Sequence, residues 1–157
     1  MESYKREFIE FLQGAGVLKF GDFTAKSGRK IPYFVNAGMI KTGDQITKMG
    51  EFYAKAYFDK LGKKEAVLYG PAYKGISLSI SAAVALSKNG LNVPFFFNRK
   101  EKGQTEKGAM QEIEEQFGFP VYSVVDVYDI IEYLEEDPAN EENVTRIKNY
   151  LAVNGAK

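Results

Sequence analysis

Positively charged side chains follow two apolar runs in the middle of this sequence. The run AVLYG leads through a Gly-Pro turn to Tyr73 and Lys74, and the run VPFFFN leads to Arg99 and Lys100. Both runs predict buried strands, and the carboxyl ends of parallel strands meet at one edge of a sheet. We therefore expect Lys74, Arg99 and Lys100 to converge on an anion such as a phosphate.

The junction GPAYKG has two interpretations. A helix that begins at Lys74 and Gly75, directly after a strand, would aim backbone N–H groups and its positive dipole end at a phosphate. The stretch is not the GxxxxGK[ST] phosphate loop, however, and a Gly-Pro strand exit with a surface lysine is also ordinary turn chemistry. Taken alone, the stretch favours the ordinary turn, whereas two cationic strand ends together favour an anion site.

A third basic segment, Lys26 with Ser27-Gly28-Arg29-Lys30, separates the β-prone runs VLKFGDFT and KIPYFV. This pattern predicts a hairpin with a cationic turn. By itself the hairpin is only exposed, but it could cover an anion if it folded over the sheet. Tyr33 and Phe34, like the other aromatic residues, are interpreted as core and not as base-stacking platforms.

The acidic residues are interpreted as structural. Asp126 and Asp129 follow the apolar run PVYSVV, where a carboxylate could contact Mg²⁺, but capping of the next helix is the favoured role. The carboxylates of EIEEQ and IEYLEED have the spacing of a solvated helix face. We therefore predict no metal site made by protein side chains.

Composition limits the function further. The chain has 157 residues, 45% of them hydrophobic, which suits one compact domain. Lys plus Arg and Asp plus Glu both total 21, so there is no general attraction to nucleic acid or to an anionic membrane. Cys and His are absent, which excludes disulfides, thiolate catalysis, Ser-His triads and His-ligated metals. No apolar run reaches the length of a membrane span, and we expect a cytoplasmic protein.

The remaining pattern predicts the elements that position these side chains. Strand, helix and strand in succession between AVLYG and VPFFFN indicate a parallel sheet, with PVYSVV as a third strand. Helices are expected from Ser3, as a cap, to Gly14, from Thr42 to Lys60, over KGISLSISAAVALSKNG, over KGAMQEIEEQFG, over 127–135 and over 140–151. The sequence thus predicts an α/β fold with a single domain over 1–157, in which 1–40 form a helix and hairpin and 41–157 form the α/β core.

Three segments together, FTAKSGRKIPYFVNAG, LYGPAYKGI and PFFFNRKE, resemble the orotate phosphoribosyltransferases, which are type I phosphoribosyltransferases. The resemblance covers residues 1–101, and GAMQEIEEQFGFPVYSVVDVYDIIEYLEE is similar to the C-terminal part of the same family. It implies a type I phosphoribosyltransferase core with the hairpin as a hood. We also expect a homodimer, because a second copy could cover apolar surface that a shortened sheet leaves exposed. The implied reaction transfers phosphoribose from 5-phosphoribosyl 1-pyrophosphate to orotate, giving orotidine 5'-phosphate and pyrophosphate in pyrimidine (UMP) synthesis.

The reaction passes through a transition state like an oxocarbenium ion, so the enzyme must position its substrates and stabilise a departing pyrophosphate. Mg²⁺ would arrive with the donor. Val35 stands where many relatives carry a second Phe. The resemblance gives roles to six residues: Lys26 would be catalytic and reach the substrates from the hood, Phe34 would flank orotate, Tyr73 and Lys74 would contact the donor, and Arg99 and Lys100 would bind its pyrophosphate.

Relatives in this family have much more chain at the position between Glu101 and Gly103. Their extra chain holds a mobile Lys/His loop, then a strand and turn like VDDVITAGT that bind the ribose and 5-phosphate, then a helix and a strand. No Asp-Asp pair and no Gly-Thr dipeptide occurs in the present sequence. The resemblance therefore implies a reduced core of about three parallel strands and an activity near background.

The segment's absence has three explanations that stay open: a natural fusion, an engineered one, or a sequence record that omits residues. Two other functions also stay open. The chain could be a non-catalytic module that binds orotate or an anion, or pairs with an intact subunit. An unrelated nucleotide-binding protein would require the matching motifs to be coincidental.

Overall fold

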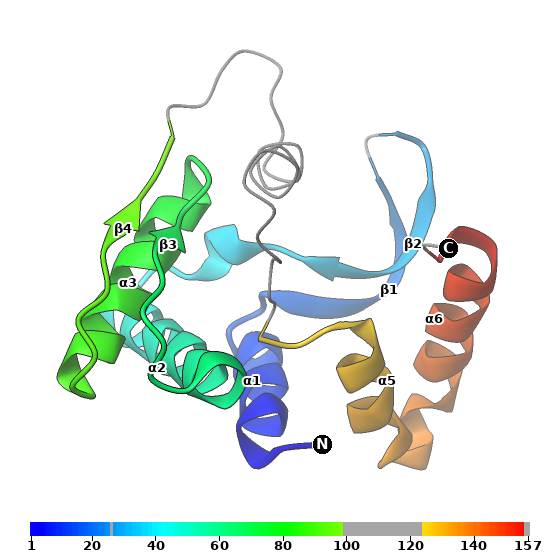
Figure 1. Ribbon diagram of the computed structural model, residues 1–157. Coiled ribbons are helices and arrows are strands. Elements are labelled where there is room, and N and C mark those ends of the chain that lie inside the picture. Colours follow the sequence, from blue (N-terminus) through cyan, green and yellow to red (C-terminus); the bar gives the residue numbers. More distant parts are fainter. Residues whose placement is uncertain (26, 99–123, 156–157) are drawn as a thin grey trace. The chain divides into compact units, whose positions relative to one another are not determined.

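The computed structural model describes residues 1–25, 27–98 and 124–155 of the chain (Figure 1). Contacts within the chain divide it into two compact units. The first unit consists of Met1–Ile40 and Val125–Lys157, and the second consists of Lys41–Val124. Among the described residues, no helix is both long enough and apolar enough to cross a membrane.

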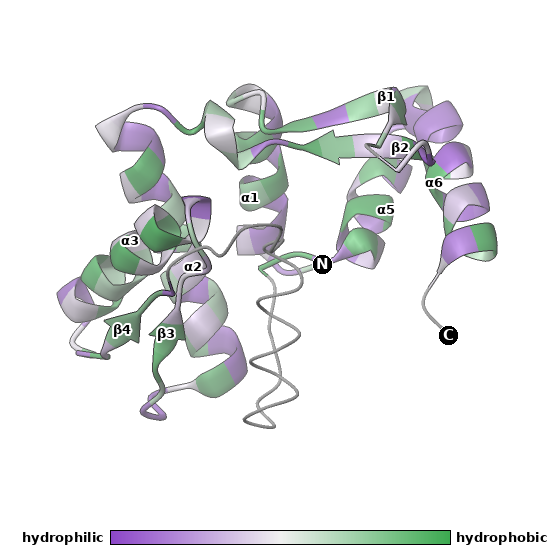
Figure 2. Ribbon diagram, turned by 90° about the horizontal axis from the view of Figure 1, so that it is seen from above, coloured by the Kyte–Doolittle hydropathy of each residue, from purple (hydrophilic) through white to green (hydrophobic). Residues whose placement is uncertain are grey.

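The first unit joins the two ends of the chain. Helix α1 packs against α5 and against strand β1, and helix α6 packs against strand β2. Each helix is amphipathic (Figure 2), and the inward faces bury Phe8, Ile9, Leu12, Ile130, Ile131, Leu134, Val144 and Ile147. The elements are α1 (Ser3–Gly14), β1 (Leu18–Thr24), β2 (Lys30–Val35), η1 (Ala37–Met39), α5 (Val127–Glu135), η2 (Pro138–Asn140) and α6 (Glu141–Asn154).

Strands β1 and β2 form the predicted antiparallel hairpin. Leu18 pairs with Val35 and Phe20 with Tyr33, but the register then shifts so that Phe23 pairs with Ile31. The extra residue of β1 lies opposite buried Pro32, which has no N–H to give to the ladder. Gly21, with φ of 144°, supplies the backbone conformation that this bulge needs.

Ion pairs connect α1 to α5. The Met1 amino group lies 2.6 Å from Glu132, Lys5 Nζ lies 2.8 Å from Asp129, and Arg6 forms a bidentate pair with Glu136. The hydrogen bond from Lys5 to Asp129 raises the pKa of Lys5. The exposed Arg6–Glu136 pair contributes little to stability, and the Lys5–Asp129 pair is largely covered, so these contacts mainly set the register of two helices that apolar burial holds together.

The helix caps support one prediction and overturn another. Asp126 accepts hydrogen bonds from the backbone N–H groups of Tyr128 and Asp129 at 2.8 and 3.0 Å, and Asp129 Oδ2 accepts from Asp126 N–H at 2.9 Å. The predicted capping role is therefore confirmed. The prediction that Ser3 caps α1 is wrong, because Glu2 occupies the N-cap and makes no side-chain cap bond.

The second unit contains the predicted parallel strand pair. Its elements are α2 (Gly43–Leu61), β3 (Leu68–Tyr69), α3 (Lys74–Lys88) and β4 (Phe95–Phe96). Helix α3 connects the two parallel strands and packs on both, and α2 packs on α3. Their core includes Ala54, Tyr57, Ala85, Leu86 and Val93.

Two predicted elements lie outside the described residues. These are the helix over KGAMQEIEEQFG and most of the third strand, PVYSVV. The expected boundary after residue 40 coincides with the unit boundary at Ile40, but α5 and α6, assigned by sequence to the α/β core, pack with the hairpin unit instead. Local sequence pattern does not reveal this packing, because the partner elements α1 and β2 lie more than ninety residues earlier in the chain. The single-domain organisation stays a prediction.

Helices α2 and α3 approach closely at Gly50. A Cβ atom at Gly50 would lie 2.4 Å from the Ser81 carbonyl oxygen, whereas one at Gly43 would meet nothing within 4 Å. We expect Gly50→Ala to lower the free energy of unfolding by about 1–3 kcal/mol, since the helices must move apart. Helix propensity alone would instead favour alanine by about 1 kcal/mol. Urea unfolding measures the difference.

Gly43→Ala is the matched control, and it should leave stability unchanged or slightly higher. A Gly50→Ala protein as stable as the Gly43→Ala protein would contradict the close helix crossing.

Candidate functional site

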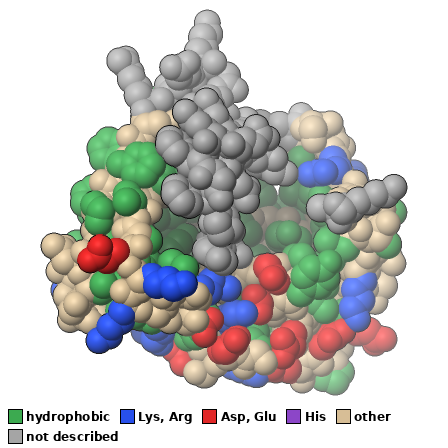
Figure 3. Space-filling model, in the orientation of Figure 1, with side chains coloured by type: hydrophobic (Ala, Val, Ile, Leu, Met, Phe, Trp, Pro, Cys, Tyr) green, Lys and Arg blue, Asp and Glu red, His purple; other side chains and the backbone are tan. Residues whose placement is uncertain are grey.

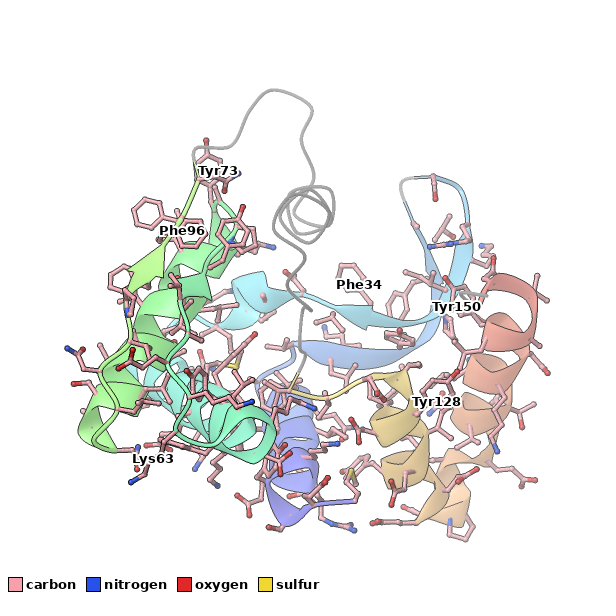
Figure 4. All side chains as sticks on the ribbon, in the orientation of Figure 1. Phe34, Lys63, Tyr73, Phe96, Tyr128 and Tyr150 are labelled. Atoms are coloured by element: carbon pink, nitrogen blue, oxygen red, sulfur yellow. The ribbon has the colours of Figure 1, made fainter. Side chains whose placement is uncertain are left out.

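The carboxyl end of the β3–β4 pair carries two predicted site residues. Strand β3 ends at Tyr69, and a four-residue loop, Gly70–Tyr73, leads directly to Lys74 at the start of α3. Tyr73 is 67% exposed and Lys74 is exposed. Figure 4 shows Tyr73 beyond the end of β4 that carries Phe96, while Lys63 lies at the opposite end of this unit. Tyr73 and Lys74 thus stand where a helix N-terminus and a cation meet solvent.

Two glycines allow this loop to lie against the first turns of α3. A Cβ atom at Gly70 would lie 2.3 Å from Ser79 Oγ and 2.5 Å from the Gly75 carbonyl oxygen. A Cβ atom at Gly75 would lie 2.6 Å from Pro71 Cδ, and Gly75 N–H donates to the Pro71 carbonyl at 3.0 Å. The peptide bond between Ala72 and Tyr73 is cis. Close packing therefore explains both glycines of GPAYKG.

The end of β4 contacts the same loop. Asn98 follows β4 by two residues, and its Oδ1 accepts a hydrogen bond from Ala72 N–H at 3.1 Å. Arg99 and Lys100, the predicted pyrophosphate ligands, come directly after Asn98 but lie outside the described residues. Asn98 had no predicted role, although a polar residue directly after three Phe residues at a strand end is a usable signal in the sequence.

Apolar side chains surround this end of the second unit. Phe95, Phe96 and Phe97 are 43%, 44% and 51% exposed, and the Tyr69 and Phe96 rings lie 4.9 Å apart. Figure 3 shows hydrophobic side chains gathered over this part of the surface. A separate groove of about 450 Å³ lies between α2 and α3, and its lining includes Glu51, Ile80, Val84 and Lys88.

Phe34, the predicted orotate contact, belongs to the first unit. It lies in β2 opposite Lys19, is 43% exposed, and its ring centroid lies 5.7 Å from that of Phe23. The interpretation of Phe34 as a core residue is therefore wrong, because the hairpin leaves part of this ring uncovered. An exposed ring backed by a second ring can stack on a planar ligand.

The hairpin turn is closed by its own backbone and touches α6. Ala25 N–H donates to the Arg29 carbonyl at 2.8 Å, and the Arg29 guanidinium lies 5.6 Å from the ring centre of Tyr150. Burial raises the pKa of Tyr33, and the neighbouring Tyr150 raises it further. Helix α6 thus supports the hairpin. Lys26, the predicted catalytic residue, lies outside the described residues.

The structure brings together only part of the predicted site. Tyr73 and Lys74 are adjacent. The loop that leads to them is hydrogen-bonded to Asn98, just after the end of β4. Phe34 belongs to the other unit, so its convergence with them stays a prediction, as do the positions of Lys26, Arg99 and Lys100. In the part of the chain that the structure describes, no group of three or more Asp, Glu, His or Cys side chains could hold a metal ion.

Comparison with known proteins gives consistent relatives, although no protein-family model matches the chain. The orotate phosphoribosyltransferase of Clostridium botulinum is 35% identical over 224 residues, covering 100% of both chains. That of Vibrio cholerae is 36% identical over 213 residues, covering 99% of this chain and 100% of the relative. The crystal structure of the Francisella tularensis orotate phosphoribosyltransferase matches with a TM-score of 0.76 and 28% identity, over 96% of this chain and 100% of that chain.

The alignment lengths also measure how much shorter this chain is. The alignment with the Clostridium botulinum relative has 224 positions and includes all 157 residues of this chain, which leaves 67 positions without a counterpart here. Because the alignment reaches both ends of both chains, these positions are internal. The alignment therefore contains internal positions that this chain lacks, whereas the loss of the donor-binding segment near Glu101–Gly103 stays a prediction.

Replacement of Tyr150 tests the contact between the hairpin and α6. We expect Tyr150→Ala to lower the pKa of Tyr33 toward its ordinary value, since it removes both burial and a neighbouring phenol. Tyr150→Phe should lower it less, because the ring remains. The measurement is a pH titration of the Tyr33 ring resonances by NMR.

Tyr128, 68% exposed on α5, supplies the control, and Tyr128→Ala should leave the Tyr33 titration unchanged. If Tyr150→Ala also left it unchanged, α6 would not support the hairpin.

Proposed function

This chain belongs to the orotate phosphoribosyltransferase family, and we propose that it is a shortened member that retains parts of the substrate-binding surface without effective catalysis. The family membership rests on 35% identity over the full length of the chain. The reaction we assign to the ancestral site is transfer of phosphoribose from 5-phosphoribosyl 1-pyrophosphate to orotate, giving orotidine 5'-phosphate and pyrophosphate. This places the protein in pyrimidine biosynthesis and, we propose, in the cytoplasm.

The observation that carries the proposed loss of activity is the internal shortening. Sixty-seven aligned positions have no counterpart here, and the sequence contains neither an Asp-Asp pair nor a Gly-Thr turn. Without such groups, the ribose hydroxyls lose the carboxylates that orient C1, and the 5-phosphate loses backbone N–H donors. A misplacement of about 1 Å can already cost about a hundredfold in rate, so we propose an activity near background.

The part of the proposed site that would bind the pyrophosphate anion is the N-terminus of α3 with Tyr73 and Lys74, called the anion end below. Lys74 adds a full positive charge to the dipole of a 15-residue helix, and the exposed Tyr73 stands beside it. A helix N-terminus stabilises an anion by about 0.3–1 kcal/mol at an exposed site, so a lysine and the dipole together support only weak binding. We propose that Arg99 and Lys100 add the remaining charge for pyrophosphate, and that Lys26 reaches the ligands from the hairpin.

The surviving orotate side is the hairpin. Orotate is a flat, conjugated ring, and the half-exposed ring of Phe34 offers it a stacking surface that Phe23 supports from 5.7 Å. We propose that this face binds orotate independently of the anion end.

The proposed Mg²⁺ would be held by the donor and not by protein carboxylates. The described residues contain no cluster of three or more possible ligands, and Asp126 and Asp129 are engaged in capping α5. Pyrophosphate oxygens are hard ligands that Mg²⁺ prefers. When bound there, the ion would neutralise charge on the leaving group, and Lys74 would act on the same group from the protein side.

We also propose a homodimer, supported by the groove between α2 and α3. Ile80 and Val84 are 37% and 50% exposed there, and Glu51 and Lys88 carry opposite charges on the same lining. A two-fold interface places the same surface on both partners, so Glu51 of one copy can face Lys88 of the other. The zero net charge of the chain adds no general repulsion between copies.

A turnover assay tests the loss of activity. The purified chain with orotate, 5-phosphoribosyl 1-pyrophosphate and Mg²⁺ should form orotidine 5'-phosphate at a rate close to the uncatalysed background. The Vibrio cholerae relative, assayed under the same conditions, is the positive control. Turnover of the present chain within about tenfold of that relative would overturn the proposal, because a missing anchor costs more than this.

A second candidate function is a non-catalytic module that binds orotate or pyrophosphate, or pairs with an intact subunit. The exposed residues Phe34 and Lys74 favour it, because neither needs the missing segment in order to reach solvent. Calorimetry with orotate and with pyrophosphate tests the binding that both proposals share. Residual turnover above the uncatalysed rate favours the shortened enzyme, heat without any turnover favours the binding module, and no heat with either ligand leaves only a structural role.

Single substitutions should separate the two surviving surfaces. Phe34→Ala is expected to weaken orotate binding about tenfold and leave pyrophosphate unaffected, because it removes one stacking ring. Lys74→Ala is expected to weaken pyrophosphate binding about tenfold and leave orotate unaffected, because it removes one charge-assisted contact. Isothermal titration calorimetry measures both affinities.

Lys63→Ala controls for net charge. Lys63 is exposed at the opposite end of the second unit, so its loss should change neither affinity (Figure 4). An equal loss of pyrophosphate binding in Lys63→Ala and Lys74→Ala would show general charge attraction instead of a site.

A further inference from the structure

The side chain of Asn98 extends the hydrogen-bond ladder of the parallel strands beyond their ends. Leu68 N–H donates to the Pro94 carbonyl at 2.9 Å, and Gly70 N–H donates to the Phe96 carbonyl at 3.0 Å. Two residues further along each of the two segments, Ala72 N–H donates to Asn98 Oδ1 at 3.1 Å. The donors advance by two residues at each step and so do the acceptors, but in the last step a side-chain amide oxygen replaces a backbone carbonyl.

This bond satisfies a donor that is hidden from water. Ala72 is 4% exposed, and the preceding Pro71 has no N–H, so Ala72 provides the first amide donor after Gly70. A buried N–H that loses its acceptor costs the full desolvation of that group. Of the two amide atoms of the Asn98 side chain only Oδ1 can accept a hydrogen bond, so the bond also fixes which way this amide is turned.

The bond attaches the loop to β4, whereas its glycines bring it against α3. These glycines are Gly70 and Gly75, and the Pro71 carbonyl accepts from Gly75 N–H. Asn98 ties Ala72 to the end of β4. Tyr73 and Lys74 follow Ala72 directly, so the position of both exposed side chains depends on these two attachments.

We propose that Asn98 is a positioning residue for the anion end of the site: it acts on pyrophosphate through Tyr73 and Lys74 by holding the Gly70–Tyr73 loop. This inference rests on the proposed function, because it assumes that the α3 N-terminus receives the pyrophosphate group. A neutral amide suits the position, since it supplies an oxygen acceptor without placing a negative charge beside a bound anion.

Two variants separate the hydrogen bond from charge. Asn98→Leu keeps the side-chain size and removes the acceptor, whereas Asn98→Asp keeps an oxygen acceptor and adds a negative charge. In Asn98→Leu, amide hydrogen exchange at Ala72, followed by NMR, should accelerate at least about tenfold. In Asn98→Asp, the Ala72 amide should stay as protected as in the unmodified chain.

Calorimetry with inorganic pyrophosphate and with orotate supplies the functional readout. Asn98→Leu should lose about tenfold in pyrophosphate affinity and nothing in orotate affinity, since one hydrogen bond to a buried donor is at stake. Asn98→Asp should also lose pyrophosphate affinity, but its deficit relative to the unmodified chain should shrink at high salt because charge repulsion is screened. The deficit of Asn98→Leu should persist at high salt.

Several results would overturn the inference. Unchanged Ala72 exchange or unchanged pyrophosphate affinity in Asn98→Leu would show that the bond does not position the loop. An equal loss of orotate affinity would show general unfolding. If the unmodified chain bound no pyrophosphate while Ala72 exchange still responded to Asn98→Leu, the attachment would be real but the proposed anion function, and with it the positioning role, would fail.

Discussion

The second unit depends on how closely its loop can approach α3. No side chain larger than a hydrogen fits at Gly70 or Gly75, where an added Cβ would lie 2.3 Å from Ser79 Oγ or 2.6 Å from Pro71 Cδ. This contact lets a strand of two residues turn directly into a helix of fifteen. Because the turn is so short, the first helical residue, Lys74, remains at the sheet edge. The cation and the helix dipole therefore act at the same place.

Such an edge suits the pyrophosphate of 5-phosphoribosyl 1-pyrophosphate and does not hold its ribose. A lysine at a helix N-terminus attracts a pyrophosphate from any direction, whereas in-line transfer also requires the ribose to be held so that C1 faces its attacker. The Clostridium botulinum relative has 67 aligned positions that this chain lacks. On the proposed function, binding and catalysis depend on different segments, so a shortened member would keep affinity for its ligands and lose turnover.

Local pattern predicted most of the fold. The hairpin, the helix that begins after Thr42 and the parallel pair followed from residue period and turn residues, and the capping role of Asp126 followed from its place before an apolar run. The Ser3 cap was a local prediction that failed, whereas two other features depend on information that is not local. The exposure of Phe34 depends on what covers the hairpin, and the packing of α5 and α6 with α1 and β2 depends on pairs of residues far apart in the sequence.

The same long-range packing explains how the first unit tolerates a shorter chain. Lys5 pairs with Asp129 across 124 residues, and the helices around this pair bury apolar side chains from both ends of the chain. Loop-closure entropy changes by only about 0.6 kcal/mol for each doubling of loop length. A loop that was longer by 67 residues, less than one doubling, would therefore cost this unit only a few tenths of a kcal/mol more. The shortening thus hardly alters the closure of the hairpin unit that carries Phe34.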